Sequence, residues 1–435
     1  MKNGKKALVP KLRFPEFRED WASSPMSEIY SFKGNNSLSR DKLNYGEGSL
    51  RNIHYGDIHT KFSLHFRVDA ESVPYINEGE SHSAVRPENY CRPGDMVFAD
   101  ASEDMEDVGK AIEIIDTGDV PLVCGLHTIL ARPDAAGFTL GFGAYLFSSE
   151  ATRKQIQHEA QGAKVLGLSA SRLGNVKLHY PSSTKEQQKI ADCLYSLDAL
   201  IAAQADKIDA LKTHKKGLMQ QLFPREGETV PRLRFSEFQD AGEWEEIPLG
   251  RVVEIASGQV DPTKPPYCDS PHVGGENIES DTGAILNVRT AKELNLISGK
   301  YVFDESYILY SKIRPALNKV AKPDFKGICS ADIYPIRPKT SQLLQDYLVC
   351  TLLTDEFLKY AKKHSDRGKI PKVNRDALMA YTPSLPVPAE QQKIAECLSS
   401  IDTLITAHTK KLDALKTHKK GLMQQLFPSP EAVGA

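Results

Sequence analysis

Two groups of polar residues have side chains of the kind that bind metal ions. One is a run of carboxylates (Asp100, Glu103, Asp104, Glu106, Asp107), and the other is a loose set of histidines (His54, His59, His65). No separate strand presents the Glu-x-Lys of a nuclease site, and the histidines lack a cysteine or an acidic triad at ligand spacing. We therefore expect a solvated acidic loop, ordinary polar histidines and no metal site.

Group-transfer chemistry is also disfavoured. Lys264-Pro265-Pro266-Tyr267 has the outline of the Asp/Asn/Ser-Pro-Pro-Tyr/Phe motif that holds the target amino group in amino-methyltransferases. That motif begins with a short hydrogen-bond acceptor, whereas lysine offers only donors. Gly141-Phe142-Gly143 alone is not a nucleotide-binding loop, and no Walker motif is present. We expect this chain to have no catalytic residue and to bind no cofactor.

These polar segments lie within a chain that contains a long internal repeat. Asp209–Pro224 recurs letter for letter as Asp413–Pro428, and Glu186–Ala191 recurs as Glu390–Ala395. A leading motif, Val-Pro-basic-Leu-Arg-Phe, opens each half at residues 9–14 and 230–235, and each is followed by Glu-Phe and one of the two tryptophans. Each half therefore consists of a leading motif, a variable region and a repeated helical segment.

The repeated segments carry apolar residues at alternating four- and three-residue spacing, which predicts a coiled-coil seam. The seam residues are Ile190, Leu194, Leu197, Ile201, Ile208, Leu211, Leu218 and Leu222 in the first copy, and Ile394, Leu398, Ile401, Ile405, Leu412, Leu415, Leu422 and Leu426 in the second. Polar residues interrupt the seam at matching positions, Gln204 with His408 and Lys215 with Lys419. We expect these residues to set the register, and a helix over 186–222 would be about 55 Å long.

The variable regions have short β-rich runs separated by glycine and proline, which favours a mixed α/β or α+β fold. We predict a pseudo-two-fold repeat in which two antiparallel helices separate two globular domains. The predicted boundaries are 1–182 and 225–386 for the domains with their leading segments, 183–224 and 387–428 for the helices, and 429–435 for a tail.

Composition indicates a soluble protein. The 435 residues have a net charge of −2, no apolar run of membrane-spanning length, and seven scattered cysteines. We expect free thiols, a cytoplasmic location and no membrane partner. Charge is uneven along the chain, because Lys359–Arg375 is basic and Asp95–Asp119 is acidic. The acidic segment is a poor candidate for contacting phosphate groups.

The repeated Glu-Gln-Gln-Lys-Ile-Ala segments, the Leu-Met-Gln-Gln-Leu-Phe-Pro ends and the leading motifs together resemble the specificity subunit of Type I restriction–modification systems. The resemblance covers nearly the whole chain. It implies two target-recognition domains, each reading half of an asymmetric bipartite sequence in double-stranded DNA. It also implies methyltransferase subunits docked on this scaffold, with restriction subunits joined through them. The two-fold internal repeat suggests two equivalent docking sites and so two methyltransferase subunits. S-adenosylmethionine, ATP and Mg²⁺ are then expected on those partners.

The DNA contacts are expected on polar loops before each helix and at strand ends. In the first half the candidates are Gln161, Lys164, Ser169 and Arg172; in the second they are Lys312, Arg314, Asn318, Lys319, Arg367, Lys369, Lys372 and Asn374. For example, replacing Arg367 by alanine should lower the salt slope of binding by about one unit if it meets phosphate, or relax one base preference by about 1–3 kcal/mol if it reads guanine.

Two other functions compete with this hypothesis. A fused adenine methyltransferase–specificity enzyme would bind S-adenosylmethionine by itself, which the altered Lys264 motif disfavours. A coiled-coil decoy scaffold without sequence readout would leave the methylation pattern of the host unchanged when the first variable region is exchanged.

Overall fold

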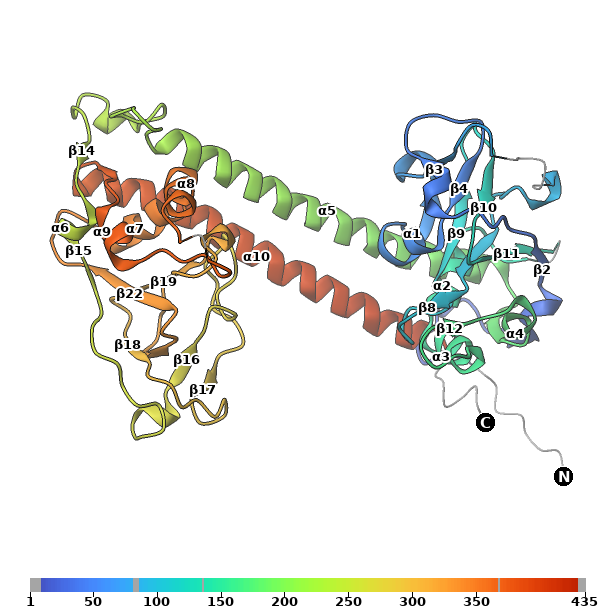
Figure 1. The fold of residues 1–435 in the computed structure, drawn as a ribbon. Helices are drawn as coiled ribbons and strands as arrows, with labels where there is room; N and C mark the ends of the chain where they lie inside the picture. The colour runs from blue at the N-terminus through green and yellow to red at the C-terminus, as the bar shows by residue number, and fades with distance from the viewer. Residues whose placement is uncertain (1–8, 81–85, 135–136, 367, 429–435) are drawn as a thin grey trace. The chain divides into compact units, whose positions relative to one another are not determined.

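The computed structural model describes residues 9–80, 86–134, 137–366 and 368–428 (Figure 1). The chain forms two compact units: unit 1 is Met1–Ala203 with Leu412–Ala435, and unit 2 is Gln204–Lys411. Each unit contains β-sheets, short helices and part of both long helices, so the mixed α+β prediction is confirmed. The predicted domain boundaries are a finer division that the two units do not test.

The largest sheet of unit 1 has the strand order β2-β11-β7-β9-β5. These strands are Tyr30–Lys33, Thr128–Pro133, Met96–Ala99, Ala111–Asp116 and His65–Arg67. All four residues of the central strand β7 are buried, as expected for a strand covered on both faces. A second sheet has the order β10-β4-β6-β3, formed by Leu122–Cys124, Arg51–Ile53, Tyr75–Ile76 and Leu43–Asn44.

Short helices and two-stranded pairs complete unit 1. The helices are α1 (Tyr55–Thr60), α2 (Phe142–Ser148), α3 (Glu150–Glu159) and α4 (Ala170–Gly174). The pairs are β1 (Trp21–Pro25) with β13 (Lys177–Pro181) and β8 (Ala101–Ser102) with β12 (Leu166–Gly167).

The buried carboxylate of Glu113 on β9 accepts hydrogen bonds from the backbone N–H groups of Gly141 and Ala144, both at 2.7 Å. These bonds fasten the start of α2 to the sheet.

Unit 2 repeats this plan with different strand lengths. Its first sheet is β15-β22-β19-β20, formed by Val253–Ile255, Ile333–Pro338, Ile308–Ser311 and Val320–Ala321; its second is β17-β16-β21-β18, formed by Arg289–Thr290, Pro271–Val273, Gly327–Cys329 and Tyr301–Phe303. The pair β14 (Glu245–Glu246) with β23 (Ser384–Leu385) and the helices α6 (Leu249–Val252), α7 (Gln345–Leu352), α8 (Asp355–Lys363) and α9 (Arg375–Ala380) complete it.

Strand register shows which elements of the two units correspond. In unit 1, Thr128 of β11 pairs with Ala99 of β7, and in unit 2, Ile333 of β22 pairs with Ser311 of β19. The second sheets agree as well, because each contains one parallel pair, β10 with β4 and β21 with β16. Each unit therefore presents the same loops from the same strand ends.

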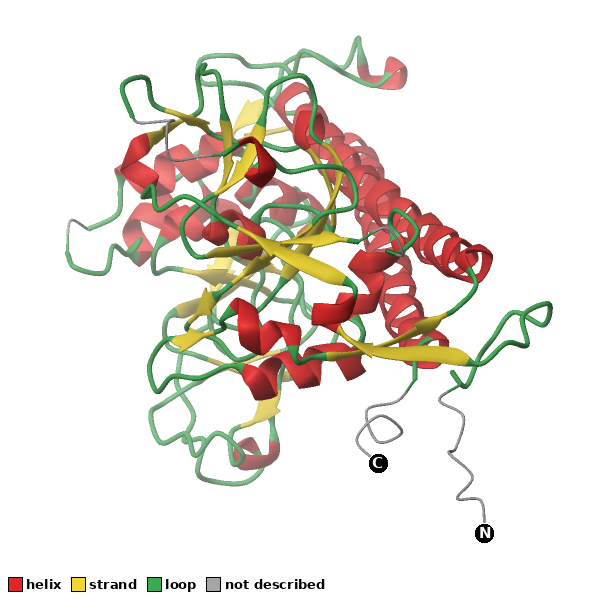
Figure 2. Ribbon diagram, turned by 90° about the vertical axis from the view of Figure 1, so that its right-hand side faces the viewer, coloured by secondary structure: helices red, strands yellow, loops and turns green. Residues whose placement is uncertain are grey.

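The long helices are α5 (Thr184–Leu222) and α10 (Pro388–Leu426), each of 39 residues and so about 58 Å long (Figures 1 and 2). They pair antiparallel. In unit 2, the Gln204 amide lies 2.6 Å from His408 Nδ1, and Lys215 Nζ lies 2.7 Å from Asp402 Oδ1. In unit 1, Lys419 Nζ donates to Asp198 at 2.5 Å. The polar residues that interrupt the seam thus contact the opposite helix.

The ends of the seam belong to the domain cores. In unit 1, Ile190, Leu194 and Leu426 pack in one apolar cluster with Trp21 and Tyr145. In unit 2, Leu222, Ile394 and Leu398 pack with Trp244 and Tyr347. The remaining predicted seam residues are at least half-buried between these ends. The repeated helical sequence therefore serves as core of both units as well as a helix pair.

The leading motif packs on the first turns of the helix that follows it. Arg13 holds the buried Glu186 carboxylate through Nε and Nη2, at 2.7 and 2.8 Å, and Arg234 holds Glu390 in the same way, at 2.8 and 2.7 Å. Gln187, whose spacing from Thr184 suggests a capping box, instead uses its buried amide to bind the backbone of Thr139 and Pro181. Its role is to join the domain to the helix.

No helix in the described ranges contains a stretch long and apolar enough to span a membrane.

Candidate nucleic-acid interface

Three segments meet at one edge of unit 1. They are residues 100–102 after β7, the turn 125–127 before β11, and the loop 161–169 before α4. The N–H of Asp100 donates to the carbonyl of His127 at 3.0 Å, and the N–H of Leu168 donates to the carbonyl of Asp100 at 2.8 Å. Gln161 and Gly167 close the third loop by mutual backbone hydrogen bonds. We call these segments the loop junction of unit 1.

The loop junction of unit 2 is formed by residues 312–314, 330–332, 365–366 and 368–374. The N–H of Lys312 donates to the carbonyl of Asp332 at 3.0 Å, and the N–H of Val373 donates to the carbonyl of Lys312 at 2.8 Å. Ser365 and Val373 close the third loop as an antiparallel bridge. The two backbone hydrogen bonds of Lys312 therefore repeat those of Asp100 in unit 1, although the third loop closes differently.

The side chains on this common backbone differ. Asp100 of unit 1 corresponds to Lys312 of unit 2, and His127 corresponds to Asp332, because each pair makes the same backbone hydrogen bond. Base identity is read by side-chain donors and acceptors, so a shared frame that carries different side chains at its edge can read two different base sequences.

In unit 1, the predicted contacts lie on or beside the third loop. Gln161 and Lys164 are exposed. Ser169 caps α4 by accepting from the N–H of Arg172 at 3.3 Å. The Arg172 guanidinium donates to the carbonyl of Glu159 at 3.0 Å and lies 3.7 Å from its carboxylate. Ser169 and Arg172 thus have structural partners, whereas Gln161 and Lys164 have free side-chain ends within the described chain.

In unit 2, the structure brings two separately predicted groups together. The Ile313–Lys372 bridge joins the segment of Lys312 and Arg314 to the loop of Lys369 and Lys372. Arg314, Lys369 and Lys372 are exposed and make no ion pair with any residue that the structure describes. Arg314 has a left-handed backbone, with φ of 47°, an uncommon conformation for a long side chain. These cations form an exposed basic edge.

The other unit 2 candidates are held by neighbours. Lys312 lies over the ring of Tyr334 at 5.0 Å. The Asn318 amide donates to Asp281 at 2.8 Å, and Lys319 Nζ donates to the carbonyl of Gly275 at 2.5 Å. Asn374 is the N-cap of α9, because its side chain accepts from the N–H of Ala377. Arg367 lies outside the described residues, so its predicted role stays a prediction.

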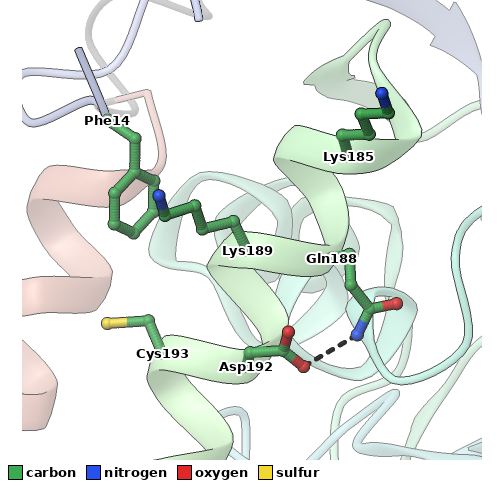
Figure 3. A pocket seen from close by; sticks show the side chains of 6 residues that line it. All are labelled: Phe14, Lys185, Gln188, Lys189, Asp192 and Cys193. Atoms are coloured by element: carbon green, nitrogen blue, oxygen red, sulfur yellow. Dashed lines mark hydrogen bonds between the residues drawn. The ribbon is translucent and has the colours of Figure 1, made fainter. Parts of the chain in front are cut away.

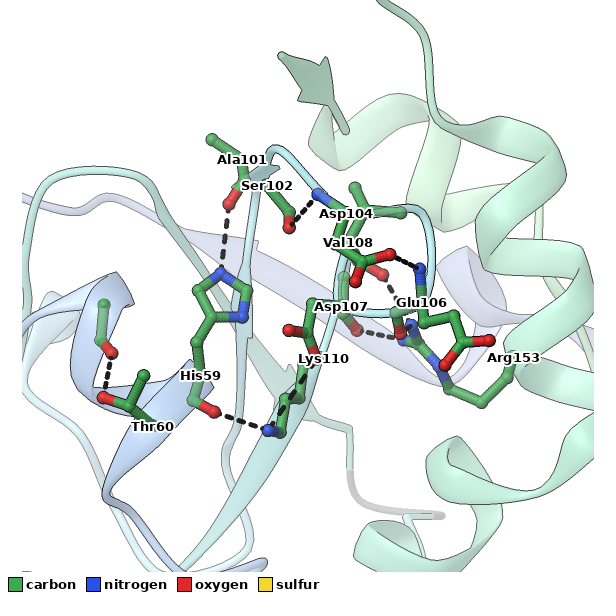
Figure 4. Close-up of polar contacts among 12 residues, drawn as sticks. His59, Thr60, Ala101, Ser102, Asp104, Glu106, Asp107, Val108, Lys110 and Arg153 are labelled. Atoms are coloured by element: carbon green, nitrogen blue, oxygen red, sulfur yellow. Dashed lines mark hydrogen bonds and ion pairs between the residues drawn. The ribbon is translucent and has the colours of Figure 1, made fainter. Parts of the chain in front are cut away.

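An acidic loop adjoins the junction of unit 1 (Figure 4). Arg153 of α3 donates to the carbonyls of Glu106, Val108 and Gly109 at 2.7–2.8 Å, and so fixes this loop from beneath. Lys110 Nζ donates to the carbonyl of His59 at 2.7 Å. The carboxylates predicted to form a solvated loop therefore lie beside predicted DNA contacts, and the two loop junctions differ in local charge.

The histidines of the first half have separate partners. The His54 ring accepts from the N–H of Gly56 at the start of α1, His59 Nε2 lies 3.1 Å from the carbonyl of Ala101, and His65 Nε2 lies 2.8 Å from the carbonyl of Gly141. Burial lowers the pKa of His54 and of His65, which favours neutral rings. Within the described ranges, no three His, Cys, Asp or Glu side chains are placed to hold a metal ion.

His127 and Asp332 also lie in the loop junctions but are not among the predicted contacts. A signal was present, because Cys124-x-x-His127 is followed by Arg132-Pro133 and Cys329-x-x-Asp332 by Arg337-Pro338 at the same spacing. This second, weaker repeat marks the corresponding turns and strands β11 and β22.

Comparison with known proteins agrees with this architecture. The family model described as "Type I restriction modification DNA specificity domain" matches residues 119–213 and 241–417. The chain is 26% identical over 278 residues to the EcoDI specificity subunit of Escherichia coli, an alignment covering 58% of this chain and 61% of that protein. It is 23% identical over 427 residues to the putative MjaX specificity subunit of Methanocaldococcus jannaschii, covering 96% and 95% of the two chains.

The fold has a solved counterpart. The crystal structure of the Type I restriction–modification S subunit from M. genitalium aligns with a TM-score of 0.59 at 16% identity, over 97% of this chain and 99% of that chain. Because the family model matches more than half of the chain, the resemblance inferred from the repeats is confirmed, and the protein belongs to the Type I restriction–modification DNA specificity family.

Proposed function

We propose that this specificity subunit reads a bipartite, asymmetric sequence in double-stranded DNA, one half-site with the loop junction of each unit. The observation that carries the proposal is the repeated backbone of the two junctions with different side chains on it, such as Asp100 against Lys312 and His127 against Asp332. One frame with two side-chain sets suits the reading of two different half-sites, because side chains read the bases.

The proposed DNA contacts are of two kinds. In unit 2, the exposed cations Arg314, Lys369 and Lys372 would meet phosphate oxygens and set the position of the domain on the duplex. In unit 1, Gln161 and Lys164 would reach the DNA from the third loop, beside carboxylates that repel phosphate. Phosphate attraction would therefore be stronger in unit 2.

We also propose two equivalent docking patches for two methyltransferase subunits. In unit 1, the docking patch is an open groove of about 580 Å³ lined by Phe14, Lys185, Gln188, Lys189, Asp192 and Cys193 (Figure 3). Lys189 pairs with Glu16 and lies 5.0 Å from the ring of Phe14, and the Gln188 amide donates to Asp192 at 2.7 Å.

The corresponding contacts exist in unit 2. Lys393 lies 3.1 Å from Glu237 and 5.9 Å from the ring of Phe235, and the Gln392 amide donates to Glu396 at 2.8 Å. Core packing does not require exposed side chains such as Gln188 and Gln392 to match. A partner that binds at both patches does require the same exposed side chains in each. The match therefore supports two copies of one partner on one chain.

In the proposed complex, restriction subunits join through the methyltransferase subunits, and S-adenosylmethionine, ATP and Mg²⁺ bind to these partners. The chain itself would orient the enzymes on the DNA. The catalytic activities would belong to the partner subunits.

Genome-wide adenine methylation in cells that carry the methyltransferase partner, with and without this chain, tests the reading function. A split motif with a fixed gap, present only with the chain, is the expected result. Exchanging residues 20–182 for those of another family member should change one half of the motif and keep the other. Identical maps with and without the chain would support a decoy instead, and binding of S-adenosylmethionine by the isolated chain would support a fused enzyme.

Native mass spectrometry tests the docking patches. Gln188→Arg and Gln392→Arg place a bulky cation on one patch each, and each variant should lose one methyltransferase subunit while the double variant loses both. Lys212→Ala is the control, because Lys212 is exposed on α5 and is none of the residues that form either docking patch. Two subunits retained by the double variant would contradict the proposal.

A further inference from the structure

His127 and Asp332 occupy the same position in the two units. Each is the last residue of the turn that leads from one sheet to the other, directly before β11 or β22. The turns begin alike, because the N–H of Gly125 donates to Ile53 at 2.9 Å and the N–H of Ser330 donates to Val273 at 3.0 Å. The backbone at this position is thus held by both neighbouring strands.

In unit 1, the structure orients the His127 ring. The residue has a left-handed backbone, with φ of 57°, which an ordinary side chain rarely adopts. Nδ1 lies 3.2 Å from Asp100 Oδ1, and the ring packs edge-on against Tyr55 at 5.3 Å between centroids. The side chain is nevertheless 48% exposed. A half-exposed ring held in an uncommon conformation by two neighbours is typical of a functional position.

The Asp100 contact determines which ring nitrogen is free. An ionised carboxylate can only accept, so Nδ1 of a neutral His127 carries the proton and Nε2 is left as an acceptor. Nε2 makes no hydrogen bond with any described residue. When the ring is neutral, its outer edge therefore presents one fixed acceptor to the surroundings.

In unit 2, Asp332 presents an acceptor at the corresponding position of the turn, on a backbone that is not left-handed. The residue is exposed, and its carboxylate makes no hydrogen bond or ion pair within the described ranges. Its backbone is fixed, because its N–H donates to Ser330 Oγ at 3.2 Å and its carbonyl accepts from the N–H of Lys312. Exposed cations of the same junction, Arg314 and Lys372, offset the repulsion between this carboxylate and phosphate.

We propose that His127 and Asp332 are specificity-determining residues, each accepting a hydrogen bond from the exocyclic amino group of an adenine or a cytosine in its half-site. This inference rests on the proposed reading function. In the major groove only adenine N6 and cytosine N4 present donors, whereas guanine and thymine present acceptors. An acceptor side chain at this position would therefore attract the first pair of bases and repel the second.

Methylation maps of cells with the methyltransferase partner and single-residue variants test the inference. Asp332→Asn keeps the shape but adds a donor, and His127→Asn suits the left-handed turn because asparagine tolerates it. Each variant should lose roughly 10- to 100-fold discrimination at one base pair of one half-site. The other half-site and the gap should stay unchanged.

The matched controls are Asp324→Asn and His158→Asn, which alter exposed residues outside the loop junctions and should preserve the motif. An unchanged motif in Asp332→Asn and His127→Asn would overturn the inference. Loss of all methylation by a folded variant would overturn it as well, because that result indicates a structural role. A wild-type chain that gives no split motif would instead refute the proposed reading function.

Discussion

Replacing Arg234 by alanine should destabilise unit 2 more than the matching replacement of Arg13 destabilises unit 1. Arg234 neutralises the Glu390 carboxylate, whose side chain is 1% exposed. Glu186, also 1% exposed, has the same arginine contact but a second donor, Trp21 Nε1 at 3.3 Å. The corresponding Trp244 Nε1 is buried without a hydrogen-bond partner in the described chain.

The size of this destabilisation follows from the glutamate charge that stays buried when the arginine is removed. Removing one partner of a buried ion pair costs about 3–5 kcal/mol, because the other charge remains buried without compensation. In Arg13→Ala, the Trp21 hydrogen bond to the carboxylate remains, and such a bond is worth about 1.5–3 kcal/mol. We therefore expect about 3–5 kcal/mol for Arg234→Ala and, after subtracting the retained hydrogen bond, about 1.5–2 kcal/mol for Arg13→Ala.

Hydrogen exchange measures this difference locally, which suits a protein of two units. The N–H groups of Leu233 and Trp244 report on unit 2, and that of Leu12 reports on unit 1. At about 1.4 kcal/mol per tenfold, Arg234→Ala should accelerate exchange of its reporters by roughly a hundred- to several thousand-fold. Arg232→Ala is the control: Arg232 and its partner Glu228 are 53% and 34% exposed, so the change should cost under about 1 kcal/mol.

Two results would refute this reasoning. Arg234→Ala could behave like the Arg232 control, or Arg13→Ala could be the more damaging of the two replacements. If the buried charge is the cause, the double variant Arg234→Ala/Glu390→Gln should recover part of the loss, since glutamine leaves no charge behind.

Four further outcomes are expected. Arg153→Ala removes three charge-assisted hydrogen bonds to carbonyls and should speed amide exchange across residues 104–110 while leaving unit 2 unchanged. Burial raises the pKa of Glu113 from 4.5 to about 7. The contribution of this group to the stability of the folded protein is therefore complete below pH 4.5 and is lost, by at most about 3 kcal/mol, as the pH rises through 7. Glu113→Gln should abolish this part of the Tm–pH profile. Burial lowers the pKa of His179 from 6.5 to about 4, so stability should instead be lost as the pH falls from 6.5 toward 4, and His179→Gln should remove that loss. Lys372→Ala should reduce the slope of log K against log salt for DNA binding by about 0.9 if this lysine meets a phosphate, as filter binding at several salt concentrations would show, and an unchanged slope would remove it from the interface.

Much of the architecture could be predicted because it is written in local patterns. The exact recurrence of Asp209–Pro224 required two equivalent halves, and the four-three spacing of apolar residues required two long helices with one buried side each. The same repeats carried the family resemblance. The polar positions Gln204 and His408 were also visible as interruptions of the seam, although their contact with each other was not.

The loop junctions could be predicted only in part. The segments of Lys312–Lys319 and Lys369–Asn374 were both selected as basic and polar, but nothing in their sequences indicated that the Ile313–Lys372 bridge joins them. The sequence could not show that Lys369 is an exposed cation whereas the ammonium of Lys319 donates a hydrogen bond to a carbonyl. Composition identifies a charge but does not show whether it has a partner.

The sequence by itself determined the duplication, the helices and the membership of a DNA specificity family, because periodicity and repetition are properties of neighbouring residues along the chain. Only the tertiary structure decided that the turns of His127 and Asp332 make the same backbone contacts and that Arg153 fixes the acidic loop beside predicted DNA contacts. These relations join segments far apart in sequence through strand register and backbone hydrogen bonds. They arise only when the sheets assemble, because each segment alone has no means of specifying its neighbour.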